Sequence, residues 1–260
     1  MGAFFRILKD FPRYLLGGFA AAGSILLLLA LWELGHGLYG DLVLPSPLAA
    51  FGEAGRMLLQ PDSQAQLLIT LYRAVFGVGL ALAVGTVLGI AAGLFVSASV
   101  LSRPLVTFFM GIPPIAWIVL AMIWFGMGDV TVIFTVVVAA FPIAFAGALQ
   151  GARTLEGQLS EMADAFKVPF FMRLKEFYLP HLFSYLLPSW IAAFGMGWKI
   201  VIMAELLAAS DGAGALLGIA RSQLDTQVAM AIVVLVVGSL MAVEYLILEP
   251  VRREVEAWRD

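Results

Sequence analysis

Long apolar runs separated by short polar stretches are the main pattern along the chain. A helix needs about 20 mostly apolar residues to cross the hydrocarbon core of a bilayer, and five or six runs reach that length. We therefore predict an all-α integral membrane bundle of six spans, which cover approximately residues 14–39, 67–97, 104–126, 130–151, 183–209 and 227–249.

Prolines mark two places where these helices are interrupted. Pro45 and Pro47 prevent a continuous helix between the first two spans, so residues 48–60 are predicted to form a short interfacial helix. Pro113 and Pro114 fall inside the third span, where freed backbone groups must be buried in protein or face water. We interpret this break, with Trp117 beside it, as a kink that lines a path through the protein. Packing alone is the alternative.

The composition supports a membrane location. The chain is 62% hydrophobic and 13% charged, with a mean hydropathy of +0.99, whereas soluble domains are about 45–50% apolar and about a quarter charged. A net charge of −3 is too small to indicate a nucleic-acid partner. Cysteine is absent, which excludes disulfides, thiolate metal sites and cysteine nucleophiles.

The distribution of basic residues predicts the orientation. The first apolar run follows a basic start, "MGAFFRILKDFPRYLLGG", and is long enough to be a retained helix and not a cleaved signal peptide. With a cytoplasmic N-terminus, three arginines fall outside (Arg56, Arg73 and Arg221), and Lys199 lies within a span. Both termini are therefore predicted to be cytoplasmic, because eleven basic residues then lie inside: Arg6, Lys9, Arg13, Arg103, Arg153, Lys167, Arg173, Lys175, Arg252, Arg253 and Arg259.

One cytoplasmic stretch, "EMADAFKVPFFMRLKEFYLP" at 161–180, is unusually polar for this chain. Its start predicts a helix whose apolar stripe includes Phe166 and Phe170, with acidic residues off that stripe. Proline at 169 should end this helix and start a second one, which is predicted to stop near Leu179-Pro180. An interfacial helix on lipid is one interpretation. A groove on a partner protein better explains why both charge signs accompany the stripe.

The spacing of Glu161, Ala163 and Leu179-Pro180 resembles the "EAA" signature of ATP-binding-cassette importer permeases. The stretches "TLYRAVFGVGLALAVGTVLGIAAG", "GIPPIAWIVLAMIWFGMGD" and "GMGWKIVIMAELLAAS" are similar to permeases that import nitrate, sulfonates, taurine or bicarbonate. The similarity covers nearly the whole chain in order. Two residues depart from the family pattern: Lys167 replaces a usual glycine, and Lys199 replaces a small or apolar residue.

The resemblance implies a single permease domain over 1–260 of the small (type I) importer kind, with a core of about 67–250 and a cytoplasmic coupling segment at 155–180. Its implied partners are two copies of an ABC ATPase subunit, a second copy of the permease, and a periplasmic or lipid-anchored solute-binding protein, in a bacterial plasma membrane. The chain has no G-x-x-x-x-G-K-[ST] loop, so ATP and Mg²⁺ are expected on the ATPase. The residues expected to contact the ATPase are Glu161, Met162, Ala163, Asp164, Phe166, Lys167 and Phe170.

Two charged residues in the fifth span are candidates for the transport path. A charge deep in a span costs about 2.5 kcal/mol or more, so Lys199 is expected to face a cavity or a partner. Glu205 follows six residues later, about 120° around the helix, which makes it a poor partner for Lys199. It could close the outer end of the path or pair with Arg221; an ordinary interfacial charge is the alternative. For Lys199 the alternatives are a structural ion pair or snorkelling.

An intramembrane enzyme and a passive channel are the two alternative classes of function. An intramembrane lipid-modifying enzyme would need clustered acid, base or metal groups, but Lys199, Glu205 and Glu33 are isolated along the sequence. His36 and His181 lack ligand-spaced neighbours and are interpreted as structural. A passive channel would not explain the coupling-type segment. A cation in a low-dielectric path favours a small anion as substrate, whereas similar permeases carry aromatic or heterocyclic vitamin precursors.

Overall fold

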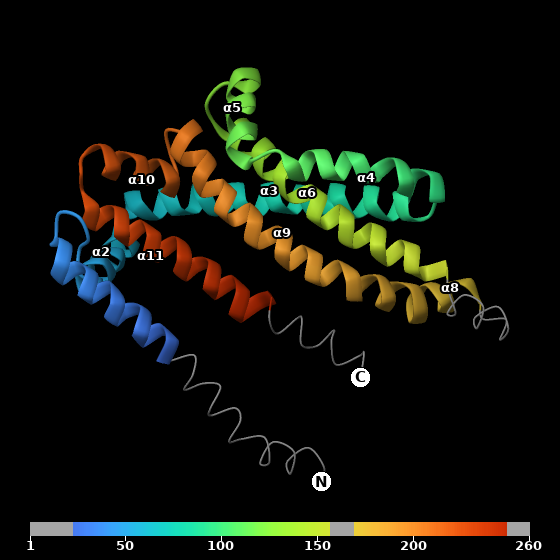
Figure 1. Ribbon diagram of the computed structural model, residues 1–260, viewed down its shortest axis with the longest axis horizontal. Helices are drawn as coiled ribbons and strands as arrows, with labels where there is room; N and C mark the ends of the chain where they lie inside the picture. Colours follow the sequence, from blue (N-terminus) through green and yellow to red (C-terminus); the bar gives the residue numbers. More distant parts are fainter. Residues whose placement is uncertain (1–22, 157–168, 249–260) are drawn as a thin grey trace, which may run out of the picture.

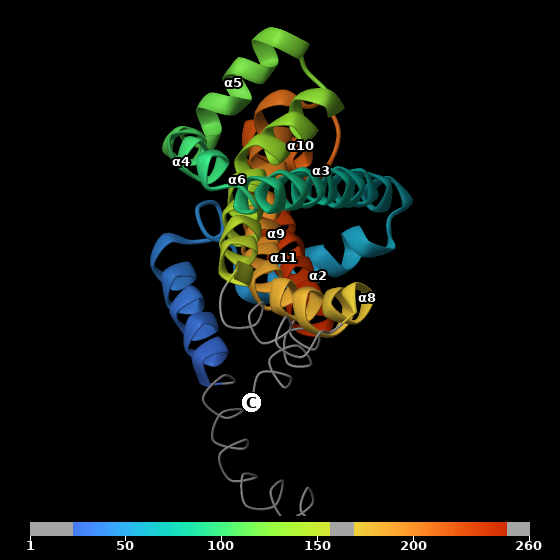
Figure 2. The same ribbon diagram turned by 90° about the vertical axis from the view of Figure 1, so that its right-hand side faces the viewer.

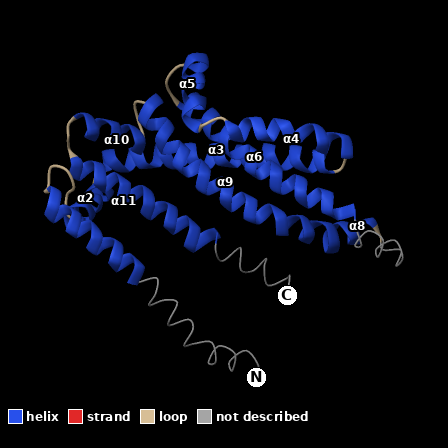
Figure 3. Cartoon of the chain, viewed as in Figure 1, coloured by secondary structure: helices blue, strands red, loops and turns tan. Residues whose placement is uncertain are grey.

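The computed structural model describes residues 23–156 and 169–248, and every regular element within these ranges is helical (Figure 3). In chain order the main elements are the helix Gly23–Tyr39, α2 (Pro47–Leu59), α3 (Pro61–Gly93), α4 (Val96–Gly111), α5 (Pro114–Phe125), α6 (Asp129–Arg153), α8 (Phe170–Arg173), α9 (Leu179–Ala208), α10 (Ala213–Ser222) and α11 (Thr226–Val243). A short 3-10 turn follows α6, and π turns precede α9 and follow α11.

Four helices are long and apolar enough to cross a membrane, and they correspond to the second, fourth, fifth and sixth predicted spans. A fifth span results if α4 and α5 are taken together. The helix Gly23–Tyr39 is apolar but shorter, and the residues that would extend it toward position 14 lie outside the described ranges. The all-helical membrane architecture is therefore confirmed for the described residues.

Both proline-rich interruptions occur where the sequence predicts them. The short helix after Pro45 is α2, whose N-terminus is capped by the Ser46 hydroxyl, which accepts a hydrogen bond from the Ala49 N–H at 3.2 Å. The third span is broken at Pro113, and α4 and α5 meet there at an angle of 89°.

One predicted boundary is wrong. Leu179-Pro180 does not end a helix; it lies in the first turn of α9, and the helix runs without a break from Phe171 to Ala208. A π turn over Leu174–Tyr178 precedes the proline, and the Leu179 N–H bonds to the Leu174 carbonyl. This wider turn changes the hydrogen-bond register just before the residue that lacks an N–H, so the proline is tolerated.

The three long helices α3, α6 and α9 lie side by side and form the centre of the bundle (Figures 1 and 2). α10 and α2 pack with α11 at one end, which we call the α10 end, and α8 lies at the opposite end (Figure 1). In both views α5 projects away from the three central helices.

Glycines on α3 allow its close approach to α6. A Cβ at Gly89 would stand 2.5 Å from the Phe145 carbonyl oxygen, and one at Gly85 would stand 2.6 Å from the Phe141 carbonyl oxygen. Because backbone atoms cannot move aside as a flexible side chain can, these two positions accept only glycine at the present helix separation. Small residues four apart are a common means of packing helices in membranes, so the glycine-rich stretch of α3 is a packing surface.

This packing predicts opposite effects for two alanine substitutions in α3. Gly89→Ala should lower the free energy of unfolding by about 1–3 kcal/mol, because the new methyl group overpacks the contact with α6. Gly79→Ala is the control, since a Cβ there meets nothing within 4 Å, and it should be neutral or stabilising by about 0.5–1 kcal/mol. Thermal unfolding of both variants in detergent measures the difference. Equal midpoints would show that α3 and α6 can separate without cost.

Candidate functional site

Lys199 lies on the exposed face of α9, a helix long enough to span a membrane. Lys199 lies nine residues before the end of α9 at Ala208, which is about 14 Å along the helix axis. Its side chain is exposed, and it forms no hydrogen bond or ion pair with the described part of the chain. Ala192, one heptad earlier, is also exposed, and a Cβ at Gly195 would meet nothing within 4 Å. This strip of α9 therefore holds a cation that no described helix covers.

Glu205, six residues after Lys199 on α9, is completely buried at 0% exposure. The Arg73 guanidinium donates to Glu205 Oε1 at 2.9 Å, and the Thr70 hydroxyl donates to Oε2 at 2.8 Å. Pairing with Arg221 is therefore wrong, and so is the alternative of an ordinary interfacial charge; Arg221 is exposed near the end of α10. The pair Arg73–Glu205 instead joins α3 to α9.

Arg73 is the residue whose role the sequence analysis missed. The charge count only assigns it to the outer side of the membrane, whereas the structure shows that it lies within α3 at 1% exposure. Besides Glu205 it binds the carboxylates of Asp129 and Asp211, with Nε to Asp129 Oδ1 at 2.8 Å and Nη2 to Asp211 Oδ1 at 2.6 Å. A signal was present: Arg73 interrupts a predicted span, and the reasoning that made Lys199 a candidate applies equally to it.

The same cluster satisfies the start of α10. The Gly214 N–H donates to Glu205 Oε2 at 3.0 Å, the Ala213 N–H donates to the Thr70 hydroxyl at 2.7 Å, and the Gly212 N–H donates to Gln66 Oε1 at 2.5 Å. These N–H groups have no partner within the helix, and a carboxylate is favourable near a helix N-terminus. Glu205 is thus held by an arginine, a hydroxyl and a helix terminus.

The residues at the helix break lie in a packed aromatic cluster. Trp117 is 6% exposed, its ring stacks on Phe109 of α4 at 5.7 Å, and Phe109 meets Phe141 of α6 at 5.1 Å. Pro113 is exposed and Pro114 is half-buried. Trp117 therefore packs on α4 through Phe109, and Phe109 in turn contacts α6.

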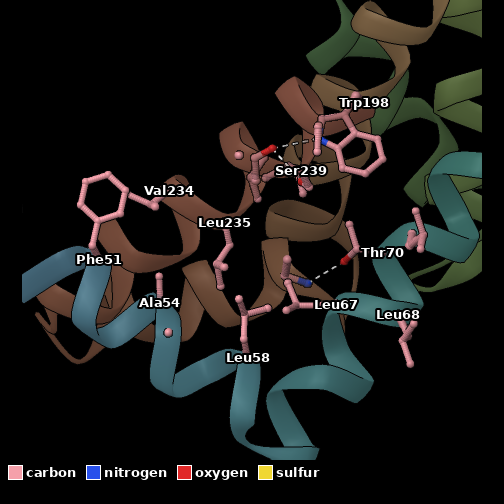
Figure 4. A pocket seen from close by; sticks show the side chains of 17 residues that line it. Phe51, Ala54, Leu58, Leu67, Leu68, Thr70, Trp198, Val234, Leu235 and Ser239 are labelled. Atoms are coloured by element: carbon pink, nitrogen blue, oxygen red, sulfur yellow. Dashed lines mark hydrogen bonds between the residues drawn. The ribbon is translucent and has the colours of Figure 1, made fainter. Parts of the chain in front are cut away.

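A cavity of about 600 Å³ lies between α2, α3, α9 and α11 (Figure 4). Its labelled walls include Phe51, Leu58, Leu67 and Leu235, and the Trp198 indole donates to the Val236 carbonyl at 3.3 Å. Among the residues that the structure describes, none that lines it is charged. The cavity is therefore apolar and separate from Lys199, although Thr70 connects its wall to the Arg73 cluster.

The two histidines have local partners. His36 Nδ1 lies 2.8 Å from the Leu44 carbonyl, and His181 Nε2 lies 2.9 Å from the Thr154 hydroxyl. The Thr154–His181 contact joins the end of α6 to the start of α9, beside the coupling segment. The coupling residues Glu161, Met162, Ala163, Asp164, Phe166 and Lys167 lie outside the described residues, and Phe170 begins α8.

These features define a multi-pass, all-helical membrane protein with a charge in one span and an ion cluster at one end. Residues 85–254 match the family described as "Binding-protein-dependent transport system inner membrane component", and the chain belongs to that family. It is accordingly the membrane component of an ABC transporter, a transport subunit and not an enzyme.

Relatives with named substrates support the same class. The putative aliphatic sulfonates transport permease protein of Bacillus subtilis is 27% identical over 90% of this chain and 85% of the relative. The taurine transport system permease protein of Escherichia coli is 28% identical over 64% of this chain and 60% of the relative. The bicarbonate transport system permease protein of Synechococcus elongatus is 25% identical over 77% of this chain and 76% of the relative.

Proposed function

We propose that this chain is the permease subunit of an ATP-driven importer for a small anion of the sulfonate, nitrate or bicarbonate kind. The observation that carries the proposal is Lys199, a cation inside a spanning helix that no described residue pairs or covers. The names of the relatives, which specify aliphatic sulfonates, taurine and bicarbonate, point to the same class of solute.

The charge of Lys199 explains why an anion suits this path. An unpaired ammonium group in a span is costly unless water or a counter-charge reaches it. In a path with little water, attraction between Lys199 and a passing anion is stronger than in bulk solvent, and a cationic solute would be repelled. The exposed strip around Lys199 on α9 also leaves room for a solute beside it, because Gly195 has no Cβ and nothing covers its position.

The partners follow from the family and from what the chain lacks. We propose two ATPase copies that bind ATP and Mg²⁺, a second copy of this permease related by a two-fold axis along the membrane normal, and an extracytoplasmic solute-binding protein. The sequence contains no phosphate-binding G-x-x-x-x-G-K-[ST] loop that could supply the ATP chemistry. The coupling segment at 155–180 would dock on the ATPase, with Phe166 and Phe170 as apolar anchors.

We further propose six spans with both termini in the cytoplasm. The four long helices and the broken α4–α5 pair supply five, and the helix Gly23–Tyr39, extended by the apolar residues before it, would supply the sixth. In this orientation the coupling segment is inside and the α10 end faces outward, which agrees with the basic residues gathered on the cytoplasmic side.

The test is uptake by proteoliposomes that contain this permease, its ATPase and its binding protein. ATP-dependent accumulation of taurine, an alkanesulfonate, nitrate or bicarbonate is expected, with two permeases and two ATPases in the native mass of the complex. A complex with one permease per two ATPases would overturn the homodimer. Uptake of a cation but of no anion would overturn the substrate class.

Replacing Phe166 by Asp tests the docking segment. A carboxylate placed in an apolar groove should weaken the contact, so we expect about tenfold less ATPase to co-purify, or ATP hydrolysis no longer linked to uptake. Leu42→Asp is the control, because it makes the same kind of change at a residue that is 84% exposed in the loop before α2, outside the coupling segment. The thermal midpoint of the membrane domain should not change. Normal assembly and uptake by Phe166→Asp would show that the docking face is misassigned.

A further inference from the structure

Arg73 binds acceptors on two sides that differ in their access to water. On one side is Glu205, which is completely buried. On the other are Asp129 and Asp211, whose side chains are 59% and 44% exposed. A single guanidinium therefore spans the boundary between the interior of the bundle and the solvent at the α10 end, and its planar fork of five donors suits such a set of acceptors.

The buried side is built as a permanent contact. Glu205 Oε1 accepts from Arg73, and Oε2 accepts from both Thr70 and the Gly214 N–H. Opening this contact would leave a buried carboxylate without its counter-charge and the Gly214 N–H without an acceptor, in a place that water does not reach. α3, α9 and the start of α10 are consequently held together through one carboxylate.

The exposed side is built differently. Asp129 and Asp211 meet Arg73 at the surface, where water can replace either contact and exposed ion pairs contribute little net free energy. Asp211 also offers its backbone carbonyl to Arg73 Nη1 at 2.9 Å, so it has a second attachment. The Asp129 side chain has only Arg73 as a described partner, through Nε and Nη2.

Asp129 stands at a corner of the fold that has the features of a hinge. It is the first residue of α6 and follows the loop that leaves α5, in which Gly126 and Gly128 have φ of 76° and 132°. At its other end α5 begins at the 89° break after α4. The corner is attached to the end of α9 by one backbone bond, from the Gly128 N–H to the Ala208 carbonyl at 2.8 Å.

α5 itself leaves one face that no other part of the described chain covers. Ile115, Val119 and Ile123, four residues apart, are 51%, 52% and 72% exposed, and the helix projects from the bundle (Figure 2). The break at one end of α5 and the glycines of positive φ at the other allow the α5–α6 corner to shift, while the opposite face of α5, with Ile118 and Ala121 at 0% exposure, stays packed in the bundle.

We propose that Arg73 is a positioning residue with two contacts of different kinds, which we call its two tiers. Its pair with Glu205 is a permanent joint that holds α3 and α9 together. Its contact with Asp129 is a latch, an ion pair that can break and that holds the α5–α6 corner in place while it is formed. The latch opens when the α10 end of the path admits solute. The timing of this release rests on the proposed transport function, whereas the two tiers themselves are properties of the chain.

A spin label at Met127, which is 66% exposed in the α5–α6 loop, reports on the latch. The chain has no cysteine, so Met127→Cys labels one site in each permease copy. The full permease with its ATPase in lipid nanodiscs is compared in three backgrounds: unsubstituted, Asp129→Asn, and Asp62→Asn. The last removes an equal charge from the first turn of α3, away from the cluster.

We expect the mobile fraction of the label to rise at least twofold in Asp129→Asn and to stay unchanged in Asp62→Asn, with the same thermal midpoint in both. Asp129→Glu should restore the original spectrum. Glu205→Gln should instead lower the thermal midpoint and reduce the yield of folded protein, because it alters the permanent joint.

Two results would overturn the proposal. An unchanged label in folded Asp129→Asn would show that Arg73 does not restrain the corner. An Asp129→Asn variant that unfolds as readily as Glu205→Gln would show that the cluster has one tier and not two. Neither measurement requires uptake, so the two proposals can fail independently. If only the anion-transport proposal fails, the label will still respond to Asp129→Asn in a complex that does not carry anions.

Discussion

Arg73→Met is expected to destabilise the folded protein by about 3–5 kcal/mol, because it leaves the buried carboxylate of Glu205 without its counter-charge. Glu205 is at 0% exposure, and its remaining partners are one hydroxyl and one backbone N–H. These two hydrogen bonds cannot neutralise the charge. The measurement is thermal or denaturant unfolding in detergent, supported by the yield of monodisperse protein.

Two further variants distinguish the effect of breaking the buried pair from the effect of removing any arginine. Arg56→Met removes an exposed arginine that pairs with Glu53 at 2.8 Å, and it should cost no more than about 1 kcal/mol. The double variant Arg73→Met/Glu205→Gln removes both charges and should recover part of the stability, since an amide can still accept from Thr70 and Gly214. If Arg73→Met behaved like Arg56→Met, the cluster would not stabilise the junction of α3, α9 and α10.

Lys199→Met is expected to reduce uptake of the anion about thirtyfold while the ATPase still assembles. Two unit charges 4 Å apart attract by about 4 kcal/mol at an effective dielectric of 20, and half of that value, about 2 kcal/mol, corresponds to a factor of about 30 in rate. The loss should appear in transport and not in stability, because Lys199 makes no described contact that folding depends on.

A conservative variant separates the effect of the Lys199 charge from the effect of its side-chain size. Lys199→Arg keeps the cation on the same strip of α9 and should retain much of the uptake, whereas Lys199→Met keeps the length and loses the charge. Uptake is measured in the reconstituted complex with its binding protein, and ATPase co-purification and thermal midpoint serve as controls. Unchanged uptake by Lys199→Met, or a natural substrate that is a cation, would leave Lys199 as a pairing or packing residue.

The predictions that depend on local pattern agree with the structure. The apolar runs locate α3, α6, α9 and α11, because whether a segment can cross a bilayer depends on its own length and composition. The break at Pro113 was also predictable, since proline removes a backbone donor wherever it lies. The continuation of the helix through Leu179-Pro180 could not be predicted from local pattern, because the π turn before it depends on how the chain enters α9.

By itself, the sequence determined the class of molecule: its apolar excess requires a membrane, and its ordered motifs indicate the permease family that residues 85–254 confirm. It also singled out Lys199, because a charge in an apolar run is visible without a structure. Which charges meet was decided only by the tertiary structure. Glu205 has Arg221 nearby in sequence, yet it pairs with Arg73, 132 residues away. The close packing of α3 against α6 and α9 places these two side chains together, and burial then makes the pair obligatory, since neither charge can return to water.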